Sequence, residues 1–266
     1  MNLCAIASGS SGNCIYVGSE KTHLLVDVGI SKKRVEEGLE SLELKASELD
    51  GILITHEHSD HISGLGVFSR KYGVPIYGTK GTLDAIKNYK GLGKVDESLF
   101  HVISPDSDFQ IDDITVEATT TWHDAADPVC YSFSNESGKV VVATDMGNYD
   151  EYLLRKLRNA NVLFIEANHD IQMLQVGPYP YYLKQRILGN YGHLSNERAG
   201  QLIRALLHEK VKAIVLGHLS KENNLAELAY ETVNLELLGN EYSNDIRDFN
   251  LQVANRDIVS QLVATK

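Results

Sequence analysis

Strand-like apolar runs recur along the whole chain and alternate with segments that have the 3.6-residue period of a helix. The longest runs, such as AIVLG and VLFIEA, are strand-sized and fall far short of the roughly 20 apolar residues that a membrane span requires. The expected strands lie at residues 13–19, 22–29, 51–56, 75–79, 113–123, 129–135, 139–145, 162–168, 212–218 and 250–255.

Two segments have clear helix signals. Residues 31–42 begin at a potential N-cap, Ser31, and residues 195–209 begin at Ser195; both carry apolar residues on one face. The first half of the chain is richer in paired strands and the second half in strand-then-helix units. This order predicts an α/β fold in which two sheets pack face to face with helices outside, an αββα four-layer sandwich.

The chain has 266 residues, of which 43% are hydrophobic, and it contains no repeat and no Gly/Ser/Pro-rich linker. We therefore expect one domain over residues 1–266. The first residues lack the basic and apolar regions of a secretory signal, and three scattered cysteines fit buried side chains in a reducing compartment. These features predict a cytoplasmic protein with no membrane association.

A formal net charge of −11 argues against nucleic-acid binding through a broad basic face. If the substrate is an anion, it must be held locally. Metal-capable residues could do this, because several expected strands end in one. These residues are Asp27, His56, His123, Asp145 and His218.

Each of these endings alone has an ordinary interpretation as a turn residue or a satisfied polar group. The stretch HEHSDH makes a shared site the better interpretation, because four potential ligands within six residues have no packing rationale. His56 and His58 lie two apart on an extended backbone and project to the same side, so they can bind one metal together with His123. Asp60 and His61 lie past the bend and can bind a second metal.

His218 would complete the second set, and Asp145 would bridge both metals. The expected metal ligands are thus His56, His58, Asp60, His61, His123, Asp145 and His218. These side chains suit Zn²⁺ or Mn²⁺, with Fe²⁺ also possible. Asp27 is expected to hydrogen-bond to the HEHSDH loop, although it could be an ordinary turn carboxylate.

This motif series resembles that of the metallo-β-lactamase (MBL) fold hydrolases. The segments ASGSSGNC, HDAADP, ATDMGN, EANHD, GPYPYYLKQRI, GHLSNERAG and LGHLSKENN are similar to the YycJ/WalJ type of bacterial MBL-fold proteins. The resemblance implies an αββα sandwich, a site for two divalent metal ions, and phosphodiesterase chemistry on DNA by a 5′-to-3′ exodeoxyribonuclease. DNA is therefore the expected partner.

A pair of metal ions predicts hydrolysis, because two cations can lower the pKa of a shared water and neutralise charge on the substrate. The expected nucleophile is a hydroxide that bridges the metals, and the expected catalytic residues are Asp60 and His193. His193 directly precedes a helix, where it could contact a phosphate or protonate a leaving oxygen. Capping or packing is an equal alternative for this histidine.

Two further stretches could bind substrate. SGSSGN, with Ser10 and Ser11, could present backbone amides to a phosphate, although a turn between strands is the stronger interpretation. GPYPYYLKQR, with Tyr179, Lys184 and Arg186, suits base stacking and phosphate contacts. We slightly favour the alternative, a helix begun by proline with the tyrosines packed beneath it.

Three other functions use the same donor set. A thioester hydrolase of the glyoxalase II type should add a basic C-terminal part, and the residues after His218 include only four basic groups. A tRNA-processing MBL nuclease should carry a Gly/Pro-rich arm, and none is visible. A regulatory protein with a structural metal should have a closed set of four ligands rather than an open pair of sites.

Overall fold

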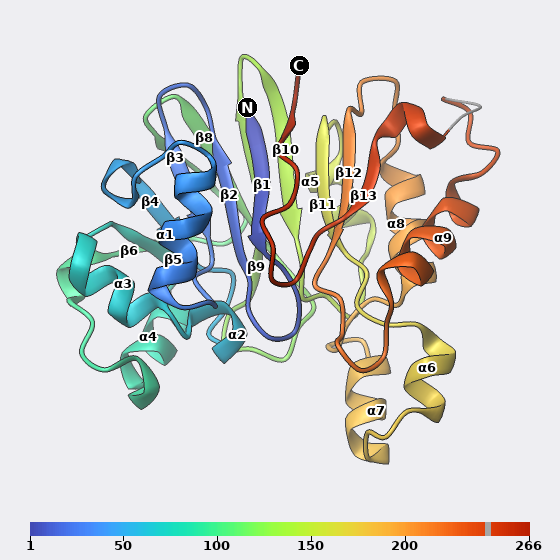
Figure 1. Ribbon diagram of the computed structural model, residues 1–266, viewed down its shortest axis with the longest axis horizontal. Coiled ribbons are helices and arrows are strands. Elements are labelled where there is room, and N and C mark those ends of the chain that lie inside the picture. Colours follow the sequence, from blue (N-terminus) through green and yellow to red (C-terminus); the bar gives the residue numbers. More distant parts are fainter. Residues whose placement is uncertain (243–245) are drawn as a thin grey trace.

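Two mixed β-sheets pack face to face at the centre of the structure, a computed structural model that describes residues 1–242 and 246–266 (Figure 1). In the described residues each sheet has seven strands. In spatial order, the first sheet contains β14 (Val263–Ala264), β1 (Asn2–Ala7), β2 (Cys14–Gly18), β3 (His23–Val26), β4 (Gly51–Leu53), β5 (Ile76–Thr79) and β6 (Phe100–Ile103). The second contains β13 (Leu251–Val253), β12 (Ala213–Gly217), β11 (Val162–Glu166), β10 (Gly138–Ala143), β9 (Val129–Asn135), β8 (Ile114–Thr120) and β7 (Asp108–Ile111).

The two sheets share one pattern of strand directions. Strand β3 pairs antiparallel with β2 and parallel with β4, and β10 pairs antiparallel with β9 and parallel with β11. Parallel pairing then continues to the outer edge, at β6 in one sheet and at β13 in the other. Ligands of α/β sheets bind outside the carboxyl ends of such strands, so the fold gathers functional loops along this rim.

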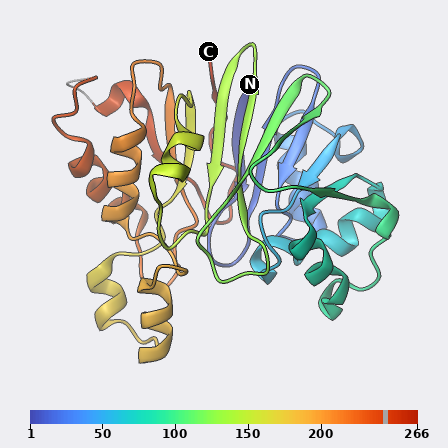
Figure 2. The same cartoon turned by 180° about the vertical axis from the view of Figure 1, so that it is seen from behind.

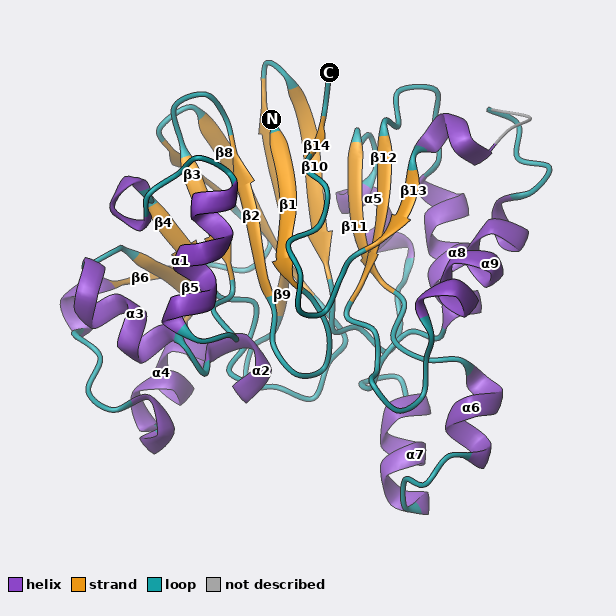
Figure 3. Cartoon of the chain, in the orientation of Figure 1, coloured by secondary structure: helices purple, strands orange, loops and turns teal. Residues whose placement is uncertain are grey.

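Helices cover the outer face of each sheet (Figure 3). The α-helices are α1 (Lys32–Ser41), α2 (Ser59–Ile62), α3 (Leu65–Tyr72), α4 (Lys80–Asn88), α5 (Glu151–Leu157), α6 (Ile171–Val176), α7 (Tyr181–Leu188), α8 (Asn196–Leu206) and α9 (Ala226–Leu237). Short 3₁₀ helices lie at Ala46–Glu48, Lys90–Leu92, Glu97–Leu99 and Ile246–Phe249. This arrangement confirms the predicted αββα sandwich.

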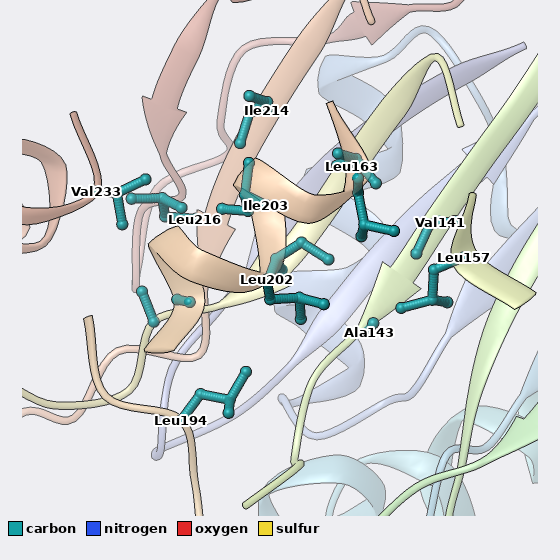
Figure 4. Packing of buried hydrophobic residues seen from close by; sticks show 14 of the residues in the cluster. Val141, Ala143, Leu157, Leu163, Leu194, Leu202, Ile203, Ile214, Leu216 and Val233 are labelled. Atoms are coloured by element: carbon teal, nitrogen blue, oxygen red, sulfur yellow. The ribbon is translucent and has the colours of Figure 1, made fainter. Parts of the chain in front are cut away.

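Strand β11 shows how the sequence builds these layers. Val162 and Phe164 join the apolar cluster between the sheets, whereas Leu163 and Ile165 join the cluster beneath the outer helices. Both faces of the strand are buried, which explains its continuous apolar run. Figure 4 shows the outer cluster, where Leu202 and Ile203 of α8 lie near Leu163. Because the central cluster takes side chains from both sheets, it supports the proposal of one domain over residues 1–266.

Both predicted helices are confirmed. Ser31 caps α1 by accepting from the amide of Arg34, and Ser195 caps α8 by accepting from the amide of Arg198. The apolar face of α8 is buried in the outer cluster. Packing of this face supplies most of the stability of such a helix.

Several sequence expectations were wrong in detail. Helices α3 and α4, which were not expected, lie in the first half, so both halves contain strand-then-helix units. The expected strand 113–123 ends at Thr120, which places His123 in a loop. Strands β1, β6, β7 and β14 were not expected; β6 and β7 have four residues each and β14 has two, so each gives only a short pattern.

Helices α6 and α7 project together beyond the ends of the strands, as both Figure 1 and Figure 2 show. Among the described residues, none of the helices combines the length and the apolarity needed to cross a bilayer. Cys4, Cys14 and Cys130 are buried and free, as expected for cysteines that serve as small core side chains.

Candidate metal centre

Three histidines form one half of a cluster at the rim of the sheets. His56 faces the Thr55 hydroxyl through Nδ1 at 3.0 Å, so its Nε2 points elsewhere. His58 Nδ1 lies 3.3 Å from His123 Nε2, and the other ring nitrogen of His123 lies 3.0 Å from the Gly192 carbonyl. One donor atom from each of His56, His58 and His123 lies within 4.8 Å of the others. Three imidazole nitrogens therefore converge on one point.

Asp60, His61 and His218 form the other half. Helix α2 begins directly after His58, and this turn carries Asp60 and His61 away from the extended pair that precedes them. His61 Nε2 lies 3.4 Å from Asp60 Oδ2, and His218 Nε2 lies 3.9 Å from the same oxygen. These three residues also place one donor atom each within 4.8 Å of the others.

Asp145 lies between the two halves and is 2% exposed. Its Oδ1 is 3.3 Å from His218 Nε2 and 3.7 Å from His123 Nε2, so it faces one histidine of each half. Its Oδ2 is 3.3 Å from His61 Nε2. The structure thus brings together all seven residues that the sequence suggested as ligands, in the two groups expected.

The donor set fits divalent cations. His56 Nε2 and Asp145 Oδ2 are buried and make no hydrogen bond within the described residues. Burial, with the neighbouring His61, lowers the pKa of His56 well below its usual value, so the ring is neutral and offers a lone pair. Burial opposes ionisation of Asp145, but His218 and His61 outweigh it and lower the pKa of Asp145 well below its usual value. Neutral imidazoles and ionised carboxylates are the forms in which these residues bind metals.

Comparison with known proteins identifies the family. The sequence model of the metallo-beta-lactamase superfamily matches residues 7–218 of this chain. The chain belongs to the metallo-β-lactamase superfamily. It is 45% identical over 228 residues to exodeoxyribonuclease WalJ of Streptococcus pneumoniae serotype 2, which covers 86% of this chain and 85% of that protein.

Two further proteins are similar to the chain. Exodeoxyribonuclease YycJ of Bacillus anthracis is 39% identical over 234 residues, which is 88% of each chain. The crystal structure of the metallo-β-lactamase fold protein YhfI from Bacillus subtilis matches with a TM-score of 0.70, at 19% identity and over 97% of this chain and 98% of that one. The second likeness shows the fold alone. With its superfamily established, the chain is a metal-dependent hydrolase.

Three residues in or beside the cluster have a left-handed backbone conformation. Asp27, Asp145 and His218 have φ of 62°, 58° and 53°. Asp27 directly follows the last residue of β3, and His218 directly follows the last residue of β12. Positive φ is uncommon outside glycine and is found preferentially at functional sites. The left-handed turn ends each strand and points the side chain across the rim.

Asp27 holds the HEHSDH loop, as the sequence suggested. Its Oδ1 accepts a hydrogen bond from the Thr55 amide at 2.9 Å, and its Oδ2 accepts from the Thr55 hydroxyl at 2.8 Å and lies 2.7 Å from His61 Nδ1. The carboxylate therefore fixes which nitrogen of His61 faces the cluster.

We expect Asp27→Asn to weaken metal binding about 10- to 100-fold while the chain still folds. Asparagine tolerates the left-handed backbone, but its single acceptor oxygen cannot replace both carboxylate oxygens, so its NH2 group must face either the Thr55 amide or the pair formed by the Thr55 hydroxyl and His61. Competition with a chromophoric chelator measures the affinity. Asp50→Asn is the control, because Asp50 accepts from the His23 amide at a distant strand end. Unchanged affinity in Asp27→Asn would show that His61 does not depend on this carboxylate.

Glu166 is a site residue that the sequence analysis missed. It closes β11, is fully buried, and accepts hydrogen bonds from the amides of Asp145 at 3.0 Å and Leu194 at 2.7 Å. Its Oε2 also lies 2.9 Å from His193 Nδ1. A carboxylate at the end of a fully apolar strand was the available signal, the same one that pointed to Asp27.

His193 lies against the cluster and does not cap α8, since Ser195 does. Its ring stacks on His218 with centroids 5.4 Å apart. Burial would lower the pKa of His193, but Glu166, Asp145 and Asp60 outweigh it and raise the pKa to about 9. These carboxylates therefore favour the protonated form of the ring. Its assignment to the substrate stays a prediction.

The SGSSGN loop packs against the cluster and uses its backbone amides for contacts within the protein, rather than offering them to a phosphate. The Ser10 amide donates to the Leu219 carbonyl, and the Gly9 amide donates to Asn13 Oδ1. Asn13 donates from its amide to the Asp60 carbonyl at 2.8 Å, and its Nδ2 lies 3.2 Å from His61 Nε2. These contacts favour the turn interpretation. A substrate contact by the exposed Ser10 and Ser11 stays a prediction.

The GPYPYYLKQR stretch forms helix α7, with Pro180 at its N-cap, and Tyr179 lies half-buried before it. The interpretation that we favoured is wrong in one respect: Tyr181 and Tyr182 are 77% and 75% exposed and do not pack beneath the helix. Lys184 donates to the carbonyls of Gln175 and Gly177, and Arg186 pairs with Asp124. Lys184 thus holds the α6–α7 hairpin, whereas Arg186 ties α7 to the loop between β8 and β9. Contact of either cation with substrate stays a prediction.

Proposed function

We propose that the chain is a dinuclear phosphodiesterase that degrades DNA from a strand end, in the 5′-to-3′ direction. The observation that carries the proposal is the pair of three-residue donor groups on either side of Asp145. Similarity over most of the chain to proteins named exodeoxyribonuclease supports DNA as the substrate. We propose two Zn²⁺ or Mn²⁺ ions per chain, with Fe²⁺ as an alternative, because imidazole and carboxylate suit all three.

His56, His58 and His123 would hold one ion, Asp60, His61 and His218 the other, and Asp145 both. Two bound cations would acidify a water and neutralise charge on the phosphate. The chain supplies the remaining steps. Glu166 accepts from Nδ1 of His193 and so favours the doubly protonated ring, and His193 stands beside both donor groups, where its Nε2 proton can pass to the departing oxygen.

A cytoplasmic location is part of the proposal. The three cysteines are buried and free, and burial raises the pKa of the Cys4 thiol to about 11 and that of the Cys130 thiol to about 12. Such thiols are inert core groups, which suits a reducing compartment.

The direct test uses purified protein whose metal content has been measured. We expect linear single-stranded or duplex DNA labelled at the 5′ end to release its label at once as a mononucleotide, while the same DNA labelled at the 3′ end shortens gradually. Closed circular single-stranded DNA should stay intact, because it has no end. RNA, a precursor tRNA and a glutathione thioester are tested beside DNA.

Asp145→Asn protein, purified in parallel, controls for contaminating nucleases. Dominant turnover of the thioester with no nuclease activity would instead make the chain a thioester hydrolase. Cleavage of the precursor tRNA in preference to DNA would favour tRNA processing. Inactivity on every substrate, with metal bound, would favour a regulatory protein with a structural metal.

Tyr181 and Tyr182 give the proposal a second test. Both rings are exposed on the projecting α7, where they can stack on the bases of a single strand. Stacking contributes about 1–3 kcal/mol per base, so Tyr181→Ser combined with Tyr182→Ser should weaken oligonucleotide binding about tenfold or more. Hydrolysis of a small nitrophenyl phosphodiester should not change. Fluorescence anisotropy of a labelled single strand measures the binding.

The matched control is Tyr89→Ser, because Tyr89 is also exposed and lies in the first half of the chain, after α4. If the double variant binds the strand as tightly as the Tyr89→Ser protein, the rings of α7 do not contact DNA.

A further inference from the structure

A cavity of about 270 Å³ lies beside the metal-donor cluster. Its wall is formed by the loop after β10, the loop after β11 with the start of α6, the end of α7, the segment before α8, and α8 itself. The polar residues that line it are Asn148, His169, Asn190, His193, Ser195 and Arg198. His193 borders both the cavity and the donor cluster, so a group in the cavity would lie next to a group at the metals.

His169 lines this cavity, and its ring makes no hydrogen bond elsewhere within the described residues. The residue is 1% exposed, and neither ring nitrogen has a hydrogen-bond partner among the described residues. Its backbone is well held, since its carbonyl accepts from the Asn196 amide at 2.9 Å. Burial lowers the pKa of His169 to about 4, so the neutral ring has one N–H to donate. A buried donor without a partner is unfavourable, and a ligand in the cavity would satisfy it.

The cavity is suited to an anion. None of the nine residues that line it is acidic, although the chain as a whole carries a net charge of −11. Arg198 contacts uncharged groups, through a hydrogen bond to Asn148 Oδ1 at 2.8 Å and a stack on the Tyr149 ring at 4.6 Å, and neither contact neutralises its positive charge. The N-terminus of α8, an eleven-residue helix capped by Ser195, also ends here, and its dipole favours negative charge.

We propose that this cavity is a second phosphate subsite, which holds a phosphate of the substrate strand next to the one at the metal centre. The inference rests on the proposed function. A phosphate group presents several acceptor oxygens, and the cavity presents donors from several sides through His169, Arg198 and Asn148. A mononucleotide product or a terminal phosphate would satisfy the same donors.

Two single variants test the subsite, His169→Leu and Arg198→Met. Leucine removes an unsatisfied polar group from a buried position, so the thermal stability of His169→Leu should equal or exceed that of the wild type. A stable fold would exclude unfolding as the reason for any loss of binding. Arg155→Met is the matched control, because Arg155 also stacks on a tyrosine ring, at 5.7 Å from Tyr152, but lies on α5 and does not line the cavity.

The first measurement is calorimetric titration of the zinc-loaded chain with inorganic phosphate. We expect two bound phosphates per chain for the wild type and for Arg155→Met. His169→Leu and Arg198→Met should retain the phosphate at the metals and bind the second about tenfold more weakly, the effect of losing a hydrogen bond to a charged group. The measurement needs no hydrolysis, so it remains informative if the nuclease proposal fails.

The second measurement compares kcat/KM for two oligonucleotides that differ only in a phosphate or a hydroxyl at the attacked end. A loss confined to the phosphorylated strand would mean that the cavity holds the terminal phosphate, and an equal loss on both would mean that it holds an internal one. Either result supports the subsite. Phosphate stoichiometry, affinity and kcat/KM that match those of Arg155→Met in both variants would overturn it.

Discussion

Replacing Asp145 by asparagine is expected to reduce bound metal towards one ion per chain and to abolish hydrolysis. The carboxylate stands between the two donor groups, with Oδ1 facing His218 and His123 and Oδ2 facing His61. A neutral amide is a poor bridge between two cations, because it has one acceptor oxygen and no negative charge. Metal analysis of the purified variant and an assay with a nitrophenyl phosphodiester measure the two effects.

The backbone is not the cause of the expected loss, because asparagine adopts left-handed φ as readily as aspartate. Asp112→Asn is the matched control: Asp112 is exposed and has φ of 46°, so it undergoes the same change in the same kind of backbone. Two metals per chain and near-normal turnover in Asp145→Asn would remove this residue from the metal centre.

The donor residues could be recognised from the sequence because metal binding limits which side chains can serve and how they must be spaced. HEHSDH places two histidines on an extended segment and an aspartate and a histidine past a turn, and the structure has that turn at the start of α2. The layers were also predictable, since runs such as that of β11 are apolar at every position and must be buried on both faces.

Other features depend on tertiary contacts that no local pattern contains. The left-handed turns at Asp27, Asp145 and His218 end their strands and direct the side chains, yet aspartate and histidine occur in many other conformations. The exposure of Tyr181 and Tyr182 follows from the projection of α7 away from both sheets. The sequence leaves His169 as either a rim residue or an ordinary turn residue with equal weight, and the burial of its ring depends on the packing of the start of α8 against its loop.

Glu166 is a different case, because the sequence did contain its signal. Glu166 is the last residue of an apolar strand, and Asp27 directly follows one. Glu166 was overlooked because the seven expected ligand positions already accounted for two metals. In the structure Glu166 accepts hydrogen bonds from two backbone amides and contacts His193, and so it connects the Asp145 turn to the segment before α8. Counting candidate ligands selects residues that could bind metal and overlooks residues that orient them.

Substitution of His193 by alanine is expected to lower kcat by about 10²–10⁴-fold while metal content and folding stay unchanged. The protonated ring is favoured, since Glu166, Asp145 and Asp60 overcome the effect of burial and raise the pKa of His193 to about 9. Its Nδ1 faces Glu166, which leaves Nε2 to face the substrate. His101→Ala, at an exposed position on β6, is the control.

The leaving group decides what His193 does. A sugar alkoxide must be protonated as it departs, whereas nitrophenolate needs little help, so a proton donor matters much less for a nitrophenyl ester. We therefore expect the defect of His193→Ala to shrink on that ester. Equal losses on both classes would make His193 a phosphate contact, in keeping with its place on the wall of the neighbouring cavity. Loss of metal would refute the assignment to substrate, because it would make the histidine a ligand.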